Sequence, residues 1–335
     1  MNIAQRLAFL WCGFCLLHYA PVQAKLRVAE QKCLEYIDQN TQQSYGGTLS
    51  LNPDVIQFKA ANCSTSVDLI INGVEALVGE FPHQAVLGKP KNGSAELEYY
   101  CGGSLISERF VLTAAHCPRP TIVRLGVHNL TDVNDNEVDC MVSDYIRHPS
   151  FTISKAYFDL ALVQLSIEVD FFPEIRPACL WTSDPFNYST VVASGFGATE
   201  HGPNSTVLMK VRLNVMDKAK CEDKFFGYRK LDDGIMDEQM CVGSQEGGRD
   251  TCNGDSGGPI QVATDLETCA YYVVGITSSG GACGIGTSES VYTKVASYVD
   301  WIEQHVWPDE WIQSREIESK EAEPTNYRIY FPGNY

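Results

Sequence analysis

Between residues 70 and 307 the chain alternates short apolar, β-branched runs with turns rich in Gly, Asn, Asp and Pro. The runs are Ala85–Leu87, Phe110–Leu112, Ile122–Leu125, Leu160–Leu165, Val191–Ala193, Tyr271–Ile276 and Val291–Tyr292. This rhythm is typical of antiparallel β barrels and sandwiches, and neither a βαβ alternation nor a repeated glycine-rich phosphate loop interrupts it. We therefore predict an all-β fold. One terminal helix is predicted over Ala296–Val306, because its apolar residues have helical spacing.

Residues 1–24 have the features of a secretory signal peptide. Arg6 supplies a positive charge, Leu7–Ala20 is apolar, and Val22–Ala24 offers a cleavage point. The apolar run is too short to cross a bilayer, so it is not a membrane span. We expect a soluble, secreted, extracellular protein that begins near Lys25.

The rest of the chain divides into three parts. Residues 25–69 form a short polar segment, residues 70–307 form the β domain, and residues 308–335 form a charged tail. We expect the tail to be flexible, with a docking peptide as the alternative. The formal net charge of −17 argues against nucleic acid and anionic membranes as partners, because both need clustered positive charge. The acidity fits solubility, and selection of a basic partner is the alternative.

The chain has 13 cysteines, of which Cys12 and Cys15 fall in the signal peptide. An odd number remains, so one cysteine is free or pairs with another chain. A secretory route favours disulfides; zinc is the alternative, but the remaining cysteines show no C-x-x-C pair. Sequons for N-glycosylation agree with an extracellular surface, and they occur at Asn62, Asn92, Asn129, Asn187 and Asn204.

The segment Cys252–Pro259, with the sequence CNGDSGGP, carries the strongest chemical signal. A serine becomes a nucleophile when a base removes its proton, and its reaction needs nearby N–H groups to hold an oxyanion. The glycines around Ser256 let the N–H groups of Gly254 and Ser256 point into one oxyanion hole. A glycine-rich turn without chemistry is the alternative.

A base and an acid are then expected elsewhere in the chain. His116 lies beside small residues and Cys117, and we predict that it is the base. Asp159 enters a strongly apolar strand, where an unpaired carboxylate would be costly, and we predict that it orients His116. A structural histidine and a turn-ending aspartate are the alternatives.

The order His116, Asp159, Ser256 and the segments around these residues resemble the chymotrypsin/trypsin family of serine proteases. The resemblance covers roughly residues 70–307. It implies two six-stranded antiparallel β barrels with the site between them. It also implies peptide-bond hydrolysis of protein substrates through an acyl-enzyme, with no metal and no organic cofactor.

The resemblance extends to activation by cleavage. Ile70–Val74 resembles the N-terminus that family members gain when they are cut, so the ammonium of Ile70 would meet Asp255 and order the oxyanion hole. Leu69 precedes the cut, where arginine or lysine is usual. We therefore expect an upstream activating protease that accepts leucine.

Family matches also imply four disulfides: Cys63–Cys179, Cys101–Cys117, Cys221–Cys241 and Cys252–Cys283. The segments Cys33–Tyr36 and Gly79–Gln84, with the Leu-Ile cut, resemble arthropod clip-domain proteases of the Snake type. On that basis we expect Cys33–Cys269, with Cys140 odd. Only two cysteines lie in residues 25–69, so the six-cysteine clip domain itself is missing and its roles are not carried over.

The resemblance further places Asp250 at the bottom of the primary specificity pocket and Gly280 at its mouth. A buried carboxylate there rewards a substrate Arg or Lys. Two departures stand out. Glu289-Ser290 replaces the usual Pro-Gly, so Ser290 would shorten the pocket, hydrogen-bond Asp250 or favour one basic side chain. Simple sequence drift with loop adjustment is the alternative. Ser279 replaces an expected aromatic residue.

Three further expectations complete the interpretation. The loop from Gly126 to Glu137 resembles a calcium loop, but Val127 and Asn134 stand where carboxylates are wanted, so we expect no bound metal. A protein inhibitor is an expected partner. The competing function is a catalytically weak or inactive protease homologue that acts as a binding partner.

Overall fold

The computed structural model describes residues 26–47, 55–61, 73–91, 94, 96–132, 137–197, 204–244, 255–265, 270–279 and 289–321. All structural statements below concern this part of the chain. Several predicted residues lie outside it: Asn62, Cys63, Leu69, Ile70, Asn92, Asp250, Cys252, Gly254, Cys269, Gly280 and Cys283. No helix among the described residues is long and apolar enough to cross a membrane.

The first half of the β domain is a closed six-stranded barrel. Its strands are β4 (Gln84–Pro90), β5 (Leu97–Leu105), β6 (Phe110–Thr113), β7 (Ile122–Leu125), β8 (Val138–Arg147) and β9 (Ala161–Leu165). All neighbours pair antiparallel, in the closed order β4-β5-β6-β9-β8-β7. Leu87, Leu112, Leu125 and Leu162 come from four strands and meet in one core. The apolar runs of the sequence therefore line the inside of this barrel.

The second half is also a six-stranded barrel. Its strands are β11 (Thr190–Gly195), β12 (Met209–Val215), β13 (Gln239–Gly243), β14 (Pro259–Asp265), β15 (Ala270–Ser279) and β16 (Ser290–Lys294). Pairing of β15 with β16 closes the ring, while β3 (Val74–Glu75) and β10 (Cys179–Leu180) add short edges. Val191, Leu213, Val242 and Ile260 form its core. The predicted fold of two six-stranded barrels is confirmed.

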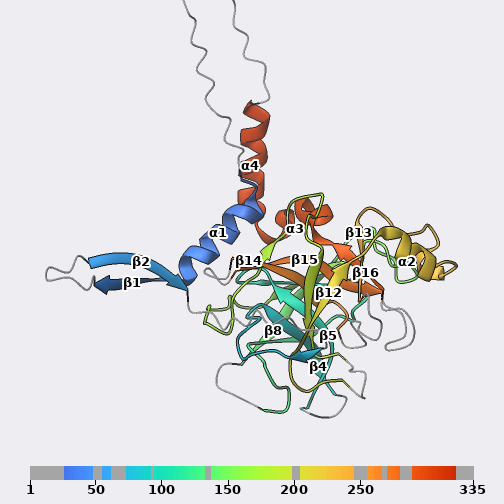
Figure 1. Cartoon of the computed structure of the whole chain (residues 1–335), viewed down its shortest axis with the longest axis horizontal. Helices are drawn as coiled ribbons and strands as arrows, with labels where there is room; N and C mark the ends of the chain where they lie inside the picture. Colours follow the sequence, from blue (N-terminus) through green and yellow to red (C-terminus); the bar gives the residue numbers. More distant parts are fainter. Residues whose placement is uncertain are drawn as a thin grey trace, which may run out of the picture.

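The C-terminal helix is also confirmed, and it continues further than expected. A 3-10 turn (Val295–Tyr298) leads into α3 (Val299–Val306), and α4 (Pro308–Glu321) follows directly. Proline is well suited to the first position of a helix, and Asp309 and Glu310 favour its N-terminal end. Pro308–Glu321, the first part of the expected tail, is therefore helical. Figure 1 shows α4 extending away from the barrels.

The segment before the β domain is more ordered than its weak periodicity suggested. It contains α1 (Val28–Asn40) and an antiparallel hairpin of β1 (Thr41–Gly47) and β2 (Val55–Ala61). In Figure 1, α1 lies beside the base of α4 and the hairpin projects outward. Arg27 pairs with Asp300 and Glu303 of α3, and the backbone N–H of Ala29 donates to Glu303 at 2.8 Å. The start of this segment is thus docked on α3.

The disulfides partly follow the expected pattern. Cys101–Cys117 and Cys221–Cys241 are present as expected, and Cys140 is free and buried. Cys179, however, bonds to Cys33, so the expected pairs Cys63–Cys179 and Cys33–Cys269 are wrong. The reason is that α1, a helix with no clear sequence pattern, lies against β10 and brings the two Cα atoms within 5.0 Å. The segment that contains α1 is therefore covalently bonded to the β domain through Cys33.

Candidate active site

The His116–Asp159 pair follows from strand register in the first barrel. Strands β6 and β9 are antiparallel, with Thr113 opposite Ala161. His116 comes three residues after Thr113 and Asp159 two residues before Ala161, so both leave the sheet at the same edge. Imidazole Nδ1 lies 2.7 Å from Asp159 Oδ2, and the backbone N–H of His116 donates to Oδ1 at 2.8 Å. Both carboxylate oxygens therefore orient His116.

Asp159 is buried, with 2% of its side chain exposed, and is well provided with donors. Ser278 Oγ, on β15 of the second barrel, donates to Oδ2 at 2.5 Å. Thr293 on β16 donates to the Asp159 carbonyl at 3.0 Å. The bonds from Ser278 and His116 to the carboxylate stabilise a charge that would be costly to bury alone, while Thr293 fixes the backbone. Phe158, immediately before Asp159, has a φ of 54°, an uncommon conformation for a non-glycine residue.

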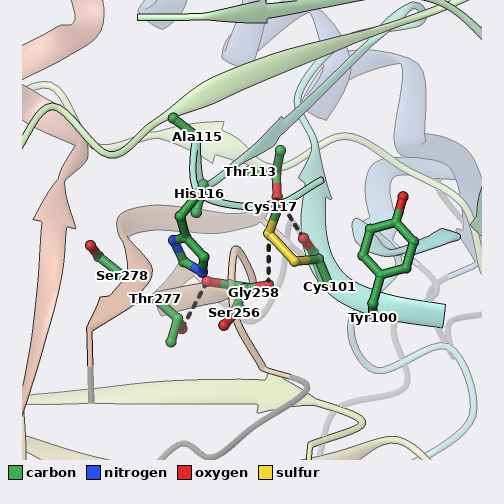
Figure 2. The surroundings of a disulfide bond; sticks show 12 residues. Tyr100, Cys101, Thr113, Ala115, His116, Cys117, Ser256, Gly258, Thr277 and Ser278 are labelled. Carbon is green, nitrogen blue, oxygen red and sulfur yellow. Dashed lines mark hydrogen bonds between the residues drawn. A yellow bond between two sulfur atoms is a disulfide. The ribbon is translucent and has the colours of Figure 1, made fainter. Parts of the chain in front are cut away.

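Ser256 lies in the turn that leads into β14, at the junction of the two barrels. The N–H of Gly102 on β5 donates to the Ser256 carbonyl at 2.8 Å, and Cys117 Sγ lies 3.7 Å from the same oxygen. Gly257 then adopts a φ of 78°, and its N–H donates to Thr277 at 2.9 Å. Figure 2 shows Ser256 and His116 together with the Cys101–Cys117 disulfide. The structure thus brings the serine turn against the segment that carries His116.

Asp255 points into a space that only glycines leave open. Its Oδ1 accepts a hydrogen bond from the N–H of Gly197 at 2.8 Å. A Cβ atom on Gly195 or on Gly197 would collide with the Asp255 carboxylate. No local sequence pattern identifies these two glycines, because they lie about sixty residues before Asp255 in the chain.

The described part of the predicted specificity pocket is its rear wall. Ser290 begins β16 and is 1% exposed, and Glu289 before it is 8% exposed. Lys224 of α2 (Lys218–Lys224) donates to the Glu289 carbonyl at 2.5 Å and lies 3.9 Å from its carboxylate. Glu289 and Ser290 are therefore buried, and Lys224 of α2 contacts both the backbone and the side chain of Glu289.

The remaining predicted surface sites are solvent-facing or paired. Asn187 and Asn204 are exposed, while Asn129 is partly exposed and donates to Asp132 at 2.8 Å. Glu137, the carboxylate kept in the calcium-like loop, lies 3.4 Å from the guanidinium of Arg124. Among the described residues, no three His, Cys, Asp or Glu side chains gather in a way that could hold a metal ion.

A histidine and an aspartate from one barrel, beside a serine at the edge of a second barrel, form the arrangement of a chymotrypsin-like serine protease. The profile of the family described as Trypsin matches residues 70–302, and this chain belongs to that family. It is 38% identical to Serine protease snk of Drosophila melanogaster over 287 residues, 83% of this chain and 65% of that protein.

Two further relatives are similar over most of this chain. The Proclotting enzyme of Tachypleus tridentatus is 34% identical over 261 residues, which are 72% of this chain and 68% of that protein. Phenoloxidase-activating factor 3 of Holotrichia diomphalia is 33% identical over 287 residues, 78% and 79% respectively. The chain spans slightly less than two thirds of the Drosophila relative. The predicted resemblance to arthropod proteases of the Snake and clip-domain type is confirmed.

Proposed function

We propose that this protein is a secreted serine endopeptidase, made as a zymogen that is cut at Leu69–Ile70. It hydrolyses peptide bonds after Arg or Lys within an extracellular proteolytic cascade. The observation that carries the proposal is the His116–Asp159 pair, in which both carboxylate oxygens contact His116 and which lies against the turn of Ser256.

The reaction begins when Ser256 Oγ attacks the scissile carbonyl carbon and His116 Nε2 takes the hydroxyl proton. The N–H groups of Gly254 and Ser256 hold the oxyanion, and Asp159 stabilises the imidazolium. The imidazolium then gives its proton to the leaving amine, and the C–N bond breaks to leave an acyl-enzyme. Water, deprotonated by His116, attacks the ester, which releases the carboxylic acid and restores Ser256.

Activation depends on a charge that exists only after the cut. The freed ammonium of Ile70 would enter the body and pair with Asp255. The Gly195–Gly197 cradle supports this proposal, because it leaves room for the Asp255 carboxylate beside these two glycines, where the N–H of Gly197 donates to it. A partly buried carboxylate is stabilised by a nearby cation.

The activating protease must accept Leu69, so a trypsin-like product would not activate its own precursor. Incubation of purified precursor with trypsin should leave Leu69–Ile70 intact, while a chymotrypsin-like protease should cut there. Clean conversion by trypsin at this bond would overturn the point. The names of the relatives, a proclotting enzyme and a phenoloxidase-activating factor, support a cascade role with protein substrates.

Specificity is proposed to come from Asp250 at the base of the pocket, Gly280 at its mouth and Ser290 on its wall. Because Ser290 is buried, its hydroxymethyl group has little room to turn away. Ser290→Gly should therefore raise kcat/KM on Arg and Lys substrates by different factors, roughly two- to tenfold, as expected for one removed buried group. If Ser290→Gly has the same kcat/KM as the wild type on the Arg substrate and on the Lys substrate, Ser290 does not narrow the pocket.

The second candidate is an inactive homologue that serves as a binding partner, and the altered pocket wall favours it. A fluorophosphonate probe on protein cut at Leu69–Ile70 separates the two candidates. Labelling at Ser256 that is lost in His116→Ala supports the enzyme, and silence after verified cleavage supports the homologue. A peptide library on the cut protein then tests the Arg/Lys preference directly.

A further inference from the structure

The turn that presents His116 is held from behind by a side chain with no expected role. Tyr145 lies on β8, and its hydroxyl reaches the carbonyl oxygens of Cys117 at 2.9 Å, Ala114 at 3.1 Å and Ala115 at 3.4 Å. A hydroxyl carries one proton, so it donates to one of these oxygens at a time. The three carbonyls flank His116 on both sides and converge on this single donor.

Arg147 supports the same contact. It lies two residues further along β8, so its side chain leaves the same face of the strand as Tyr145. Its Nη2 donates to the Cys117 carbonyl at 3.2 Å, and its guanidinium lies 5.2 Å from the centroid of the Tyr145 ring. Tyr145 and Arg147 thus bind one carbonyl together, and the stacked guanidinium limits the movement of the ring.

The other sides of the turn are fixed by known parts of the site. The N–H of His116 donates to Asp159, and Cys117 is bonded to Cys101. The first contact holds the backbone N–H of His116, and the disulfide holds the side chain of Cys117. The carbonyl side is the direction from which Tyr145 approaches. Removal of its hydroxyl would leave partly buried carbonyl groups with one donor fewer, and a turn free to rotate by small amounts.

We propose that Tyr145, braced by Arg147, is a positioning residue for His116. It fixes the turn of Ala114–Cys117 so that the imidazole meets Asp159 and the Ser256 hydroxyl at the same time. Tyr145 does not touch the substrate, so it acts on the chemical step and leaves substrate binding unchanged. This inference rests on the proposed protease activity.

The test compares Tyr145→Phe with Tyr100→Phe in the full chain after cleavage at Leu69–Ile70. Tyr100 is the matched control, because its hydroxyl also donates to a backbone carbonyl of the same barrel, that of Arg119, at 3.2 Å. On a small chromogenic substrate Tyr145→Phe should lower kcat about five- to tenfold with KM unchanged, while Tyr100→Phe stays within about twofold. Labelling of Ser256 by the fluorophosphonate probe should slow by the same factor as kcat.

Several outcomes would overturn the inference. One is a lower melting temperature of Tyr145→Phe with kcat unchanged, which would show a structural role alone. Another is a rise in KM with kcat unchanged, which would place the effect in binding. If Tyr145→Phe does not fold, Arg147→Gln replaces it, with an expected two- to fivefold loss of kcat. A wild-type protein that fails to label at all defeats the proposed function instead, so the two failures are distinguishable.

Discussion

Gly257 shows how a single residue sets the geometry of the serine turn. Its φ of 78° is a backbone conformation that glycine adopts readily and other residues rarely adopt. A Cβ atom at this position would also collide with Thr113 Oγ1 and lie 2.8 Å from the Gly102 carbonyl oxygen. Gly257→Ala should therefore shift Ser256 and lower kcat/KM about a hundredfold. Gly227→Ala is the control, because Gly227 has a similar φ of 75° but open space around it. Equal activity of the two variants would contradict this account.

His83 belongs to a buried polar chain between the barrels. Its Nε2 lies 2.7 Å from Gln261 Oε1, Gln261 Nε2 donates to Ser194, and Ser194 donates to Gln84. Burial lowers the pKa of His83 from 6.5 to about 4, although the hydrogen bond to Gln261 opposes the shift. The residue is therefore neutral in the folded protein well below the pH at which the unfolded chain takes up its proton.

This shift predicts a loss of stability in acid. As the pH falls below 6.5, His83 becomes protonated in the unfolded chain. In the folded protein it stays neutral until about pH 4. The stability linked to His83 is thus present above pH 6.5, is lost between pH 6.5 and 4, and amounts to roughly 3 kcal/mol. Urea unfolding at pH 7 and pH 4.5 should show a smaller decline in His83→Gln than in wild type. An equal decline would count against the shift.

Among single residues, the proposed catalytic residues were recognisable in the sequence, but the residues that contact them were not. His116, Asp159 and Ser256 are recognisable because each lies in a short, distinctive segment. Ser278 and Tyr145 have no such local pattern, because they reach the site through barrel closure and act on backbone or carboxylate oxygens. Contacts of this kind depend on register, which a local sequence pattern does not specify.

Among the elements, β12 and the segment before β4 are joined by a buried ion pair. Lys210 Nζ lies 2.6 Å from Glu80 Oε1, and both side chains are 3% exposed. The second oxygen of Glu80 accepts from the N–H of Leu77 at 2.8 Å. Lys210 also pairs in register with Val74 of β3, the strand that follows Ile70 in sequence. The Lys210–Glu80 ion pair therefore holds the segment from Val74 to Glu80, close in sequence to the proposed cut, against β12.

Lys210→Met should leave Glu80 as a buried charge without its cation and lower the free energy of unfolding by roughly 3–5 kcal/mol. The matched change Lys218→Met removes an exposed pair with Asp237 and should cost about 0.5 kcal/mol or less. Chemical denaturation of both variants measures the difference. A loss below 1 kcal/mol for Lys210→Met would show that the pair is not needed.

The strands and the additional helices differ in how well the sequence predicts them. The strands follow from short apolar runs that bury their side chains in a barrel. Helix α1 has no such run. It is held instead by a disulfide, a buried carboxylate and single buried residues such as Tyr36, and none of these gives a periodic pattern in the sequence. Helix α4 is highly charged, so its sequence resembles that of an unstructured tail. It follows the buried Trp307, and ion pairs of Glu310 with Lys32 and of Arg315 with Asp300 join it to α1 and α3.

For the whole molecule, the Cys33–Cys179 bond closes a sequence separation of 146 residues. Such a link restricts the unfolded chain, by roughly 5 kcal/mol in the chain-entropy account. Cys33→Ser/Cys179→Ser should therefore unfold at markedly lower urea concentration than wild type. Non-reducing peptide maps of the cut protein should contain a Cys33–Cys179 peptide, and a Cys63–Cys179 peptide in its place would refute this connectivity.

The docking of α1 also bears on how the molecule is assembled during synthesis. Helix α1 leaves the ribosome early, but Asp300 and Glu303, its partners on α3, follow 273 and 276 residues later. A nascent chain that stops after Ser256 already holds the three proposed catalytic residues and β10, which carries the disulfide partner of Cys33. It lacks Asp300 and Glu303, so the N-terminal end of α1 has not yet gained its contacts with α3. Contacts so distant in sequence form late. A product truncated before α3 would therefore hold α1 by the disulfide and β10 but leave Arg27 without these two carboxylates.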